Sequence, residues 1–173
     1  MTDSTDPDRQ DRITVHPRTG PHNSLHKWYK LRSPLRVAIQ YLVILLCRLS
    51  PSLRLKRALF RAIGMDVGSG VAWGLESTPD VFWPQLITVE DDAVIGYDAT
   101  ILCHEFLRDE YRTGEVVIRE GAMIGAGAVV LPGVEIGENA RVAANSLVTQ
   151  DVPSASTVAG VPATVESRAD CAE

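Results

Sequence analysis

His104 is the residue of this sequence whose type and position best suit acid–base chemistry. It is the only histidine after His26, and it lies where a six-residue repeat, described below, is interrupted. Histidine is the most frequent general base near neutral pH and can take the proton of a hydroxyl group during attack on a carbonyl carbon. A single histidine is often structural instead, so the residue alone leaves both roles open.

Cys103 precedes His104, and a thiol nucleophile that forms a covalent intermediate is therefore an alternative. Adjacent side chains of an extended backbone point to opposite sides, which favours a buried Cys103 over a nucleophile. The other cysteines are Cys47 and Cys171, and no CxxC pair occurs. The sequence therefore predicts neither a disulfide framework nor a cysteine zinc site, and it fits a reducing compartment.

The remaining histidines, His16, His22 and His26, all precede the repeats. A zinc site of the carbonic anhydrase type needs three histidines that converge from neighbouring coils. Only His104 is available there, so we expect no metal.

A six-residue repeat is the element that must position His104. Aliphatic residues occur at every sixth position in one block, which consists of Ile118, Ile124, Val130, Ile136, Val142 and Val148. Small or short residues follow four positions later, as at Ala122, Ala128 and Ala140. A second block in another register contains Val89, Ile95 and Ile101, and a fainter start lies near Ile63.

A period of six fits neither an amphipathic α-helix nor a long strand. It fits a very short strand followed by a tight turn, repeated around a triangular coil with three such units in each turn. The pattern predicts an all-β repeat fold, a parallel β-helix of about five coils stacked at ~4.8 Å. An N-terminal helical segment precedes it.

The chain divides into four segments by composition. We expect a flexible N-terminal tail over residues 1–32, a basic amphipathic helical segment over 33–63, the β-helix over 64–160 with a loop at 107–117, and a C-terminal tail over 161–173. With 173 residues, of which 45% are hydrophobic, one folded unit with appendages is expected.

Charge is distributed unevenly along the chain. Residues 12–65 contain eleven Lys or Arg and no acid, whereas residues 66–173 contain eighteen acids and five bases. The basic segment could contact an anionic membrane, an acidic ligand or the acidic remainder of the chain. Its apolar run from Val37 to Leu49 is too short to span a bilayer, and packing against protein is favoured over weak peripheral membrane contact. No early apolar stretch follows the charged first residues, which argues against a cleaved signal peptide, so a cytoplasmic protein without a nucleic-acid partner is expected.

The sequence resembles the hexapeptide-repeat acyltransferases, in particular the coenzyme A-dependent galactoside and maltose O-acetyltransferases. The resemblance covers residues 63–165 and is carried by ILCHEF at 101–106, VVLPGVEIG at 129–137 and VTQDVPSASTVAGVPA at 148–163. It implies a left-handed coil, a homotrimer with active sites between subunits, and acetyl-CoA as co-substrate.

The same resemblance implies roles for individual residues. His104 corresponds to the catalytic base, and the backbone N–H of Ala126 to the oxyanion donor. Asp80 is a candidate for binding acceptor hydroxyls, although a turn aspartate is the alternative. The implied coenzyme A site consists of Gly125, Ala126, Ala144, Thr149, Gln150 and Arg168.

The residues expected near the coenzyme depart from the family pattern. Relatives commonly carry a base where this chain has Gln150 and Thr164, and only Arg141 and Arg168 remain nearby. A neighbouring copy's basic N-terminal segment could compensate, or the donor could differ. The resemblance implies acetyl transfer from an acyl-CoA to a hydroxyl of a sugar or similar small acceptor. The alternative is a non-catalytic β-helix scaffold or binding module.

Overall fold

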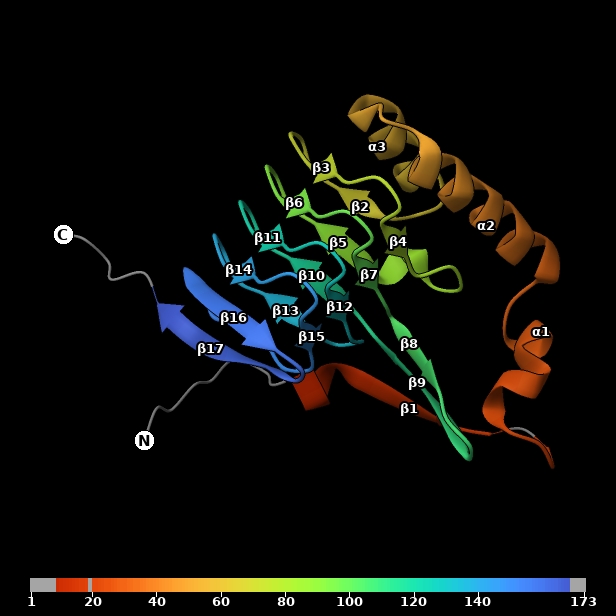
Figure 1. Ribbon diagram of the computed structural model, residues 1–173. Coiled ribbons are helices and arrows are strands. Elements are labelled where there is room, and N and C mark those ends of the chain that lie inside the picture. The colour runs from red at the N-terminus through yellow and green to blue at the C-terminus, as the bar shows by residue number, and fades with distance from the viewer. Residues whose placement is uncertain (1–8, 19, 169–173) are drawn as a thin grey trace.

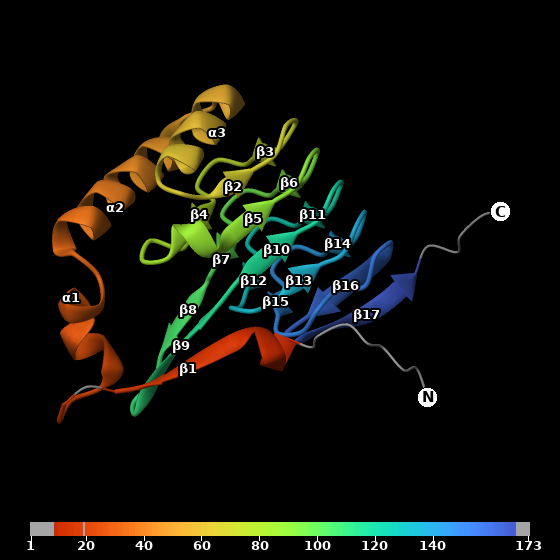
Figure 2. The ribbon, with the colours of Figure 1, turned by 180° about the vertical axis from the view of Figure 1, so that it is seen from behind.

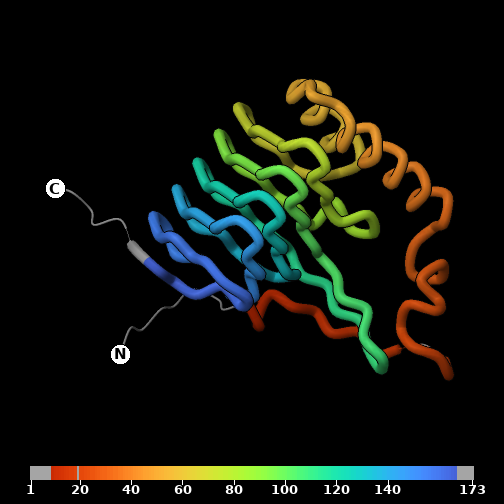
Figure 3. Tube along the Cα trace, in the orientation of Figure 1, coloured from red at the N-terminus to blue at the C-terminus, as the bar shows by residue number. Residues whose placement is uncertain are grey.

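A computed structural model describes residues 9–18 and 20–168. Its main body is a prism of three parallel sheets, whose short strands follow one another around the prism and are joined by tight turns (Figures 1 and 3). The first face contains β2 (Asp66–Val67), β5 (Ile87–Val89), β10 (Val116–Ile118) and β13 (Glu135–Ile136). The second face contains β3 (Ala72–Trp73), β6 (Val94–Ile95), β11 (Met123–Ile124), β14 (Arg141–Val142), β16 (Ser156–Gly160) and β17 (Ala163–Arg168). The third contains β4 (Thr78–Pro79), β7 (Thr100–Ile101), β12 (Val129–Val130) and β15 (Leu147–Val148).

The hexad residues form the core of this prism. In register, Val89 pairs with Ile118 and Ile118 with Ile136, so that aliphatic side chains from successive coils lie directly above one another. These residues are at most 1% exposed, because the prism interior admits only side chains that stack in layers. The strands complete four turns within the described residues, and β16 belongs to a further, partial one.

Gly125 shows why a corner of the prism requires glycine. A Cβ at this position would lie 2.5 Å from the backbone nitrogen of Ala144 on the next coil. Such a contact cannot be relieved, because the opposing atom belongs to the backbone. The close approach therefore fixes the stacking of the coils at this corner.

Two helices cover the N-terminal end of the prism, as the top right of Figure 1 shows. They are α2 (Pro34–Leu49) and α3 (Leu53–Ala62), within the segment for which helices are expected. Lys56 of α3 is 1% exposed, and its Nζ donates to the carbonyls of Trp73 and Gly74 at 3.0 and 2.7 Å. These bonds join the helix to the first coil. In the part of the chain that is described, no helix is long and apolar enough to cross a membrane.

An arm leaves the prism between β7 and β10, and it accounts for the change of register between the two hexad blocks. It consists of β8 (His104–Phe106) and β9 (Glu110–Gly114), paired antiparallel, with β1 (Ile13–Pro17) on the outer side of β9 (Figure 2). Short helical turns η1 (Arg9–Arg12) and η2 (Ser24–Lys27) flank β1 in the chain, and α1 (Trp28–Leu31) follows.

This arm corrects two expectations. Residues 107–117, expected as a loop, contain β9 and the start of β10. Residues 9–31, expected within a flexible tail, contain η1, β1, η2 and α1, while residues 1–8 lie outside the described residues. The physical reason is that β1 is held by hydrogen bonds to β9, about one hundred residues later, and local periodicity carries no signal of such pairing.

The C-terminal end is also more ordered than expected. Strand β17 pairs antiparallel with β16 within the predicted tail 161–173, and residues 169–173 lie outside the described residues. Figure 2 shows this pair at the end of the prism opposite α3. The antiparallel strand adds to the edge that the last parallel coil would otherwise expose.

Candidate active site

Asp80 and His104 form the centre of the candidate site. The carboxylate Oδ2 of Asp80 contacts the imidazole Nδ1 of His104 in a short hydrogen bond. The Asp80 side chain is fully buried, whereas the His104 side chain is 14% exposed. Because a carboxylate accepts and does not donate, this contact places a proton on Nδ1 and leaves the lone pair on Nε2. Nε2 has no hydrogen-bond partner within residues 9–18 and 20–168.

Three backbone N–H groups hold Asp80 in place. Its Oδ1 accepts from Phe82 and Trp83, each at 2.8 Å, and its Oδ2 accepts from Cys103 at 2.7 Å. The first two bonds shape the turn that follows β4, so Asp80 is a turn aspartate as well as the partner of His104. Both oxygens are engaged and neither is exposed, which does not favour the predicted contact of Asp80 with acceptor hydroxyls.

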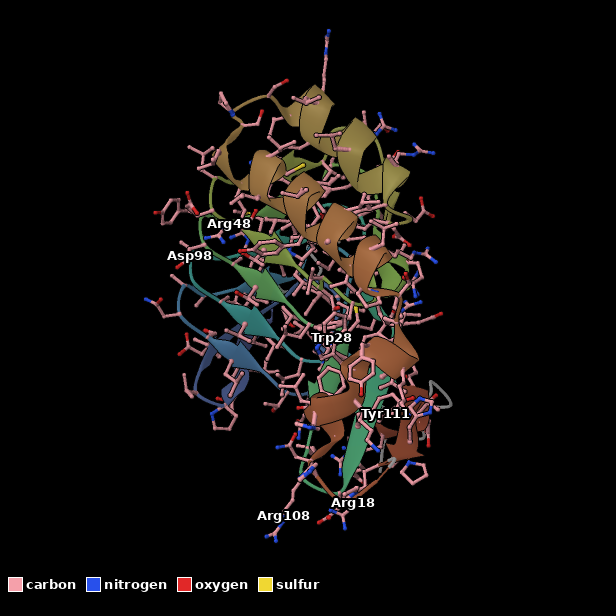
Figure 4. All side chains as sticks on the ribbon, turned by 90° about the vertical axis from the view of Figure 1, so that its right-hand side faces the viewer. Arg18, Trp28, Arg48, Asp98, Arg108 and Tyr111 are labelled. Carbon is pink, nitrogen blue, oxygen red and sulfur yellow. The ribbon has the colours of Figure 1, made fainter. Side chains whose placement is uncertain are left out.

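Aromatic rings surround the imidazole. The ring centroids of Phe82, Trp83 and Phe106 lie 5.0, 5.1 and 5.0 Å from that of His104. Trp28 contacts Phe82 at 5.5 Å, and Tyr111 stacks on Trp83 at 6.1 Å. Figure 4 shows Trp28 of α1 and Tyr111 of β9 on the same side of the molecule. These rings limit the motion of His104 and make its surroundings apolar.

Cys103 points into the core. It is 0% exposed, and its thiol donates to the carbonyl of Leu86 at 3.5 Å. Burial raises the pKa of the Cys103 thiol well above its ordinary value, and the negative charge of Asp80 raises it further. The thiol is therefore protonated at neutral pH and unsuited to nucleophilic attack.

The residues proposed for the oxyanion and the pantetheine arm lie at adjacent corners of the second face. Ala126 follows β11, and its carbonyl accepts from the N–H of Asn145, directly after Ala144, at 2.8 Å. The N–H of Ala126 donates to no other group in the described part of the chain, and the residue is exposed. This backbone donor therefore has no partner within the described part of the chain.

Thr149 and Gln150 line a hollow of about 470 Å³ at the C-terminal end of the prism. Arg9, Gln10 and Asp151 complete its lining. The Nε of Arg9 donates to the carbonyl of Pro132 at 2.8 Å, which fixes the arginine beside the hollow. Arg168 ends β17, and its side chain lies outside the described residues. A basic side chain is thus present where Gln150 departs from the family pattern.

The single chain brings together some of these groups and separates others. Asp80 meets His104, the corners of Gly125 and Ala144 adjoin, and Thr149 and Gln150 share one hollow. No hydrogen bond between described residues joins His104 to Ala126 or to the hollow, although Arg9 of the hollow lies 3.9 Å from the carboxylate of Glu105, which follows His104. Among these same residues, no group of three or more His, Cys, Asp or Glu could hold a metal ion.

Sequence reasoning missed the aromatic rings around His104 and the contribution of Arg9. The stretch PDVFWP at 79–84 carried a signal for the rings, because Phe82 and Trp83 directly follow Asp80. No local pattern indicated Arg9, since η1 reaches the hollow only through the pairing of β1 with β9.

Comparisons with known proteins agree with this fold. A family model described as "Bacterial transferase hexapeptide (six repeats)" matches residues 115–150. The protein named "Putative acetyltransferase YvoF", from Bacillus subtilis (strain 168), is 41% identical over 148 residues, which are 85% of this chain and 86% of YvoF.

Two solved structures share the architecture. A maltose O-acetyltransferase from Clostridium difficile 630 has a TM-score of 0.61 at 19% identity, over 80% of this chain and 90% of that chain. The Vibrio cholerae acetyltransferase VCA0836, complexed with acetyl coenzyme A, has a TM-score of 0.59 at 21% identity, over 78% of this chain and 87% of that chain. The stacked hexads and the similarity to YvoF place this chain in the hexapeptide-repeat acyltransferase family. It is an enzyme of the acetyltransferase class, and its family implies a left-handed coil.

Proposed function

We propose that this protein transfers an acetyl group from acetyl-CoA to a hydroxyl group of a sugar or similar small acceptor, with His104 as the general base. The contact between Asp80 and His104 is the observation that carries the proposal. It leaves Nε2 as the basic nitrogen, on an imidazole that is still partly exposed. A base with this tautomer can take a proton from an acceptor hydroxyl without any metal.

The reaction follows from these groups. The acceptor oxygen attacks the thioester carbonyl carbon while Nε2 of His104 takes the hydroxyl proton. The N–H of Ala126 donates to the oxyanion of the tetrahedral intermediate, which forms when the new C–O bond is made. The C–S bond then breaks, and coenzyme A leaves as a thiol after receiving the proton from His104. The products are the acetyl ester and coenzyme A.

We propose that the active site lies between subunits of a homotrimer. Support comes from the placement of His104 after β7 of the third face and of Ala126 after β11 of the second face, because the oxyanion donor and the base must act on the same thioester. The coenzyme would lie along the corners of Gly125, Ala126 and Ala144, with its nucleotide near Thr149, Gln150 and Arg168. Acetyl coenzyme A in the VCA0836 complex supports this choice of donor.

We further propose weak peripheral contact of residues 33–63 with an anionic lipid surface. Five side chains of α2 form an exposed apolar stripe, Leu35, Ile39, Leu42, Leu46 and Leu49, each between 53% and 70% exposed. Arg36 of the same helix and Arg54 of α3 are exposed and have no ion pair among the described residues, whereas Arg48 pairs with Glu76 at 2.7 Å. Apolar side chains beside unopposed cations are the composition that an anionic bilayer surface binds.

An acetyl-CoA turnover assay tests the proposed reaction. Purified protein is given acetyl-CoA with a panel of neutral sugars, amino sugars and hydroxylated lipids, so that ester and amide products are both detected. His104→Ala should lower turnover by about two to four orders of magnitude, with the assembly and the melting temperature nearly unchanged. His22→Ala, which removes an exposed histidine outside the site, is the matched control. Turnover that survives in His104→Ala would exclude His104 as the base, and no turnover with any acceptor would favour the scaffold alternative.

A further inference from the structure

Arg32 lies beside the candidate base, although it belongs to the N-terminal segment. It follows α1, and its backbone N–H donates to the carbonyl of Trp28 at 3.0 Å. Its guanidinium carbon lies 5.1 Å from the ring centroid of Trp83. The same ring lies 5.1 Å from that of His104. The cation and the imidazole therefore contact the same indole side chain.

The guanidinium of Arg32 is partly buried without a counter-ion. Its Nε and one terminal nitrogen, Nη2, are inaccessible to solvent and have no hydrogen-bond partner among the described residues. Arginine cannot shed its charge by deprotonation in a protein. A buried cation that makes no hydrogen bond is costly, so its retention requires an explanation.

Neighbouring groups do not neutralise this charge. Burial lowers the pKa of Arg32 and the adjacent Arg36 lowers it further, while Asp80 acts in the opposite direction. Asp80 cannot serve as a partner, because its oxygens are engaged by His104 and by three backbone N–H groups. Residues 12–65, which include η2, α1 and α2, contain no acid at all.

Resting on the proposed acetyl transfer, we infer that Arg32 binds an oxyanion of the acceptor, either a carboxylate or a phosphate. The acceptor class is then a hydroxylated acid or a phosphate monoester, such as a sugar acid or a sugar phosphate. Nη1 of Arg32 is not among the inaccessible atoms, and a guanidinium that lies over an aromatic face keeps its N–H groups in its own plane, where they can donate to a carboxylate or to a phosphate. An acceptor held in this way extends across Trp83 and presents a hydroxyl to Nε2 of His104.

The kinetic test compares acceptors that differ mainly in charge. Glucose is paired with glucose 1-phosphate and with glucuronate, and galactose with galactose 1-phosphate and galacturonate. We expect the protein to prefer at least one anionic member, and Arg32→Gln to lower kcat/KM for that member by about 10- to 100-fold. Neutral sugars and the KM for acetyl-CoA should stay within about twofold. Arg32→Lys should retain part of the preference, because it keeps the charge and loses the paired geometry.

Arg54→Gln is the matched control, since Arg54 is an exposed arginine of α3 outside the site. An Arg32→Gln variant that loses activity equally on neutral and anionic acceptors overturns the inference. A raised KM for acetyl-CoA alone also overturns it, because the anion would then belong to the donor. If Arg32→Gln keeps the anion preference but no longer forms the oligomer in sedimentation, the partner of Arg32 is an acid of a neighbouring copy, and the inference is overturned.

Ligand binding separates this inference from the proposed reaction. The thermal stabilisation by glucuronate, glucose 1-phosphate, inorganic phosphate and glucose is measured at low salt for the unchanged protein, Arg32→Gln and Arg54→Gln. Stabilisation by the anions alone, lost only in Arg32→Gln, supports the site even if no acetyl transfer is found. Equal stabilisation in all three proteins, or none in any, refutes it. A response to inorganic phosphate and glucose 1-phosphate without glucuronate selects phosphate as the anion, and the reverse selects carboxylate.

Discussion

The carboxylate of Asp80 meets the Nδ1 of His104 although the two residues are 24 positions apart in the chain. Asp80 follows β4 of the first coil and His104 opens β8, directly after β7 of the second coil. Because β4 and β7 pair in parallel, with Pro79 opposite Ile101, their ends lie at the same edge of the prism. The register of two adjacent coils therefore aligns the carboxylate with the imidazole.

Asp80→Asn should lower kcat by about two to four orders of magnitude, because an amide can stabilise the other imidazole tautomer and cannot balance the imidazolium that forms during transfer. The KM for acetyl-CoA should change less than about twofold, since the carboxylate is buried and has no exposed atom that could contact the donor. Steady-state kinetics with both substrates varied would measure this split. Asp98→Asn, an exposed aspartate in a turn, is the control.

The same Asp80→Asn protein needs a folding check, because Asp80 also accepts three backbone hydrogen bonds. Circular dichroism and thermal unfolding would show whether the turn after β4 persists. A folded Asp80→Asn protein with unchanged kcat would contradict the positioning role of Asp80.

Cys103→Ala should retain acetyl transfer within about threefold, because the raised pKa of the buried thiol keeps it from forming a thiolate at neutral pH. Iodoacetamide should leave the activity of the unchanged protein intact for the same reason. Initial rates before and after alkylation would measure this. Inactivation by alkylation at Cys103, together with an inactive Cys103→Ala that remains folded, would restore the nucleophile hypothesis.

The repeat pattern was sufficient to predict the prism and its core. Ile118, Ile124 and Val130 each face inward because their spacing matches one residue for every face of a triangular coil. Short strands with a fixed period carry a strong signal, because each side chain meets its equivalent on the next coil. The repeat is interrupted after Ile101, and this interruption drew attention to His104.

The remaining features depend on contacts between segments that are distant in sequence. Strand β1 has no amphipathic signature, and its pairing with β9 brings Arg9 to Gln150. The partnership of Asp80 with His104 depends on coil register, which an isolated aspartate before a turn does not reveal. Arg32 was indistinguishable from ten other bases in residues 12–65 until its place beside Trp83 was known.

Gln150→Lys should tighten coenzyme A binding in a manner that weakens as salt rises, because a cation would be added to the hollow that Thr149 lines. Arg9→Gln should have the opposite effect and raise the dissociation constant by about 3- to 10-fold at low salt. Thr164→Lys offers a second position for the added charge. Isothermal titration of coenzyme A at two salt concentrations would measure all three changes.

Arg108→Gln is the control for Arg9→Gln, because it also removes one positive charge, at an exposed position on the arm (Figure 4). If neither lysine variant changes coenzyme A affinity at low salt, the nucleotide lies elsewhere or the donor is a different acyl carrier. This titration tests the identity of the acyl donor. The role of His104 is tested separately, by the turnover assay.

We expect the exposed apolar stripe of α2 to contact an anionic lipid surface. Vesicles that contain an anionic lipid should co-sediment part of the protein at low salt, and less as salt increases, because the attraction of the flanking arginines is screened. Leu42→Asn combined with Leu46→Asn should abolish binding, since both leucines are about 60% exposed and supply the apolar contact. Arg54→Gln combined with Arg61→Gln should weaken binding at low salt and have little effect at high salt. Neutral vesicles should bind little under any condition. If the unchanged protein ignores anionic vesicles while the leucine variant alters the oligomeric state in sedimentation, then α2 packs against another copy of the chain and the proposal of membrane contact fails.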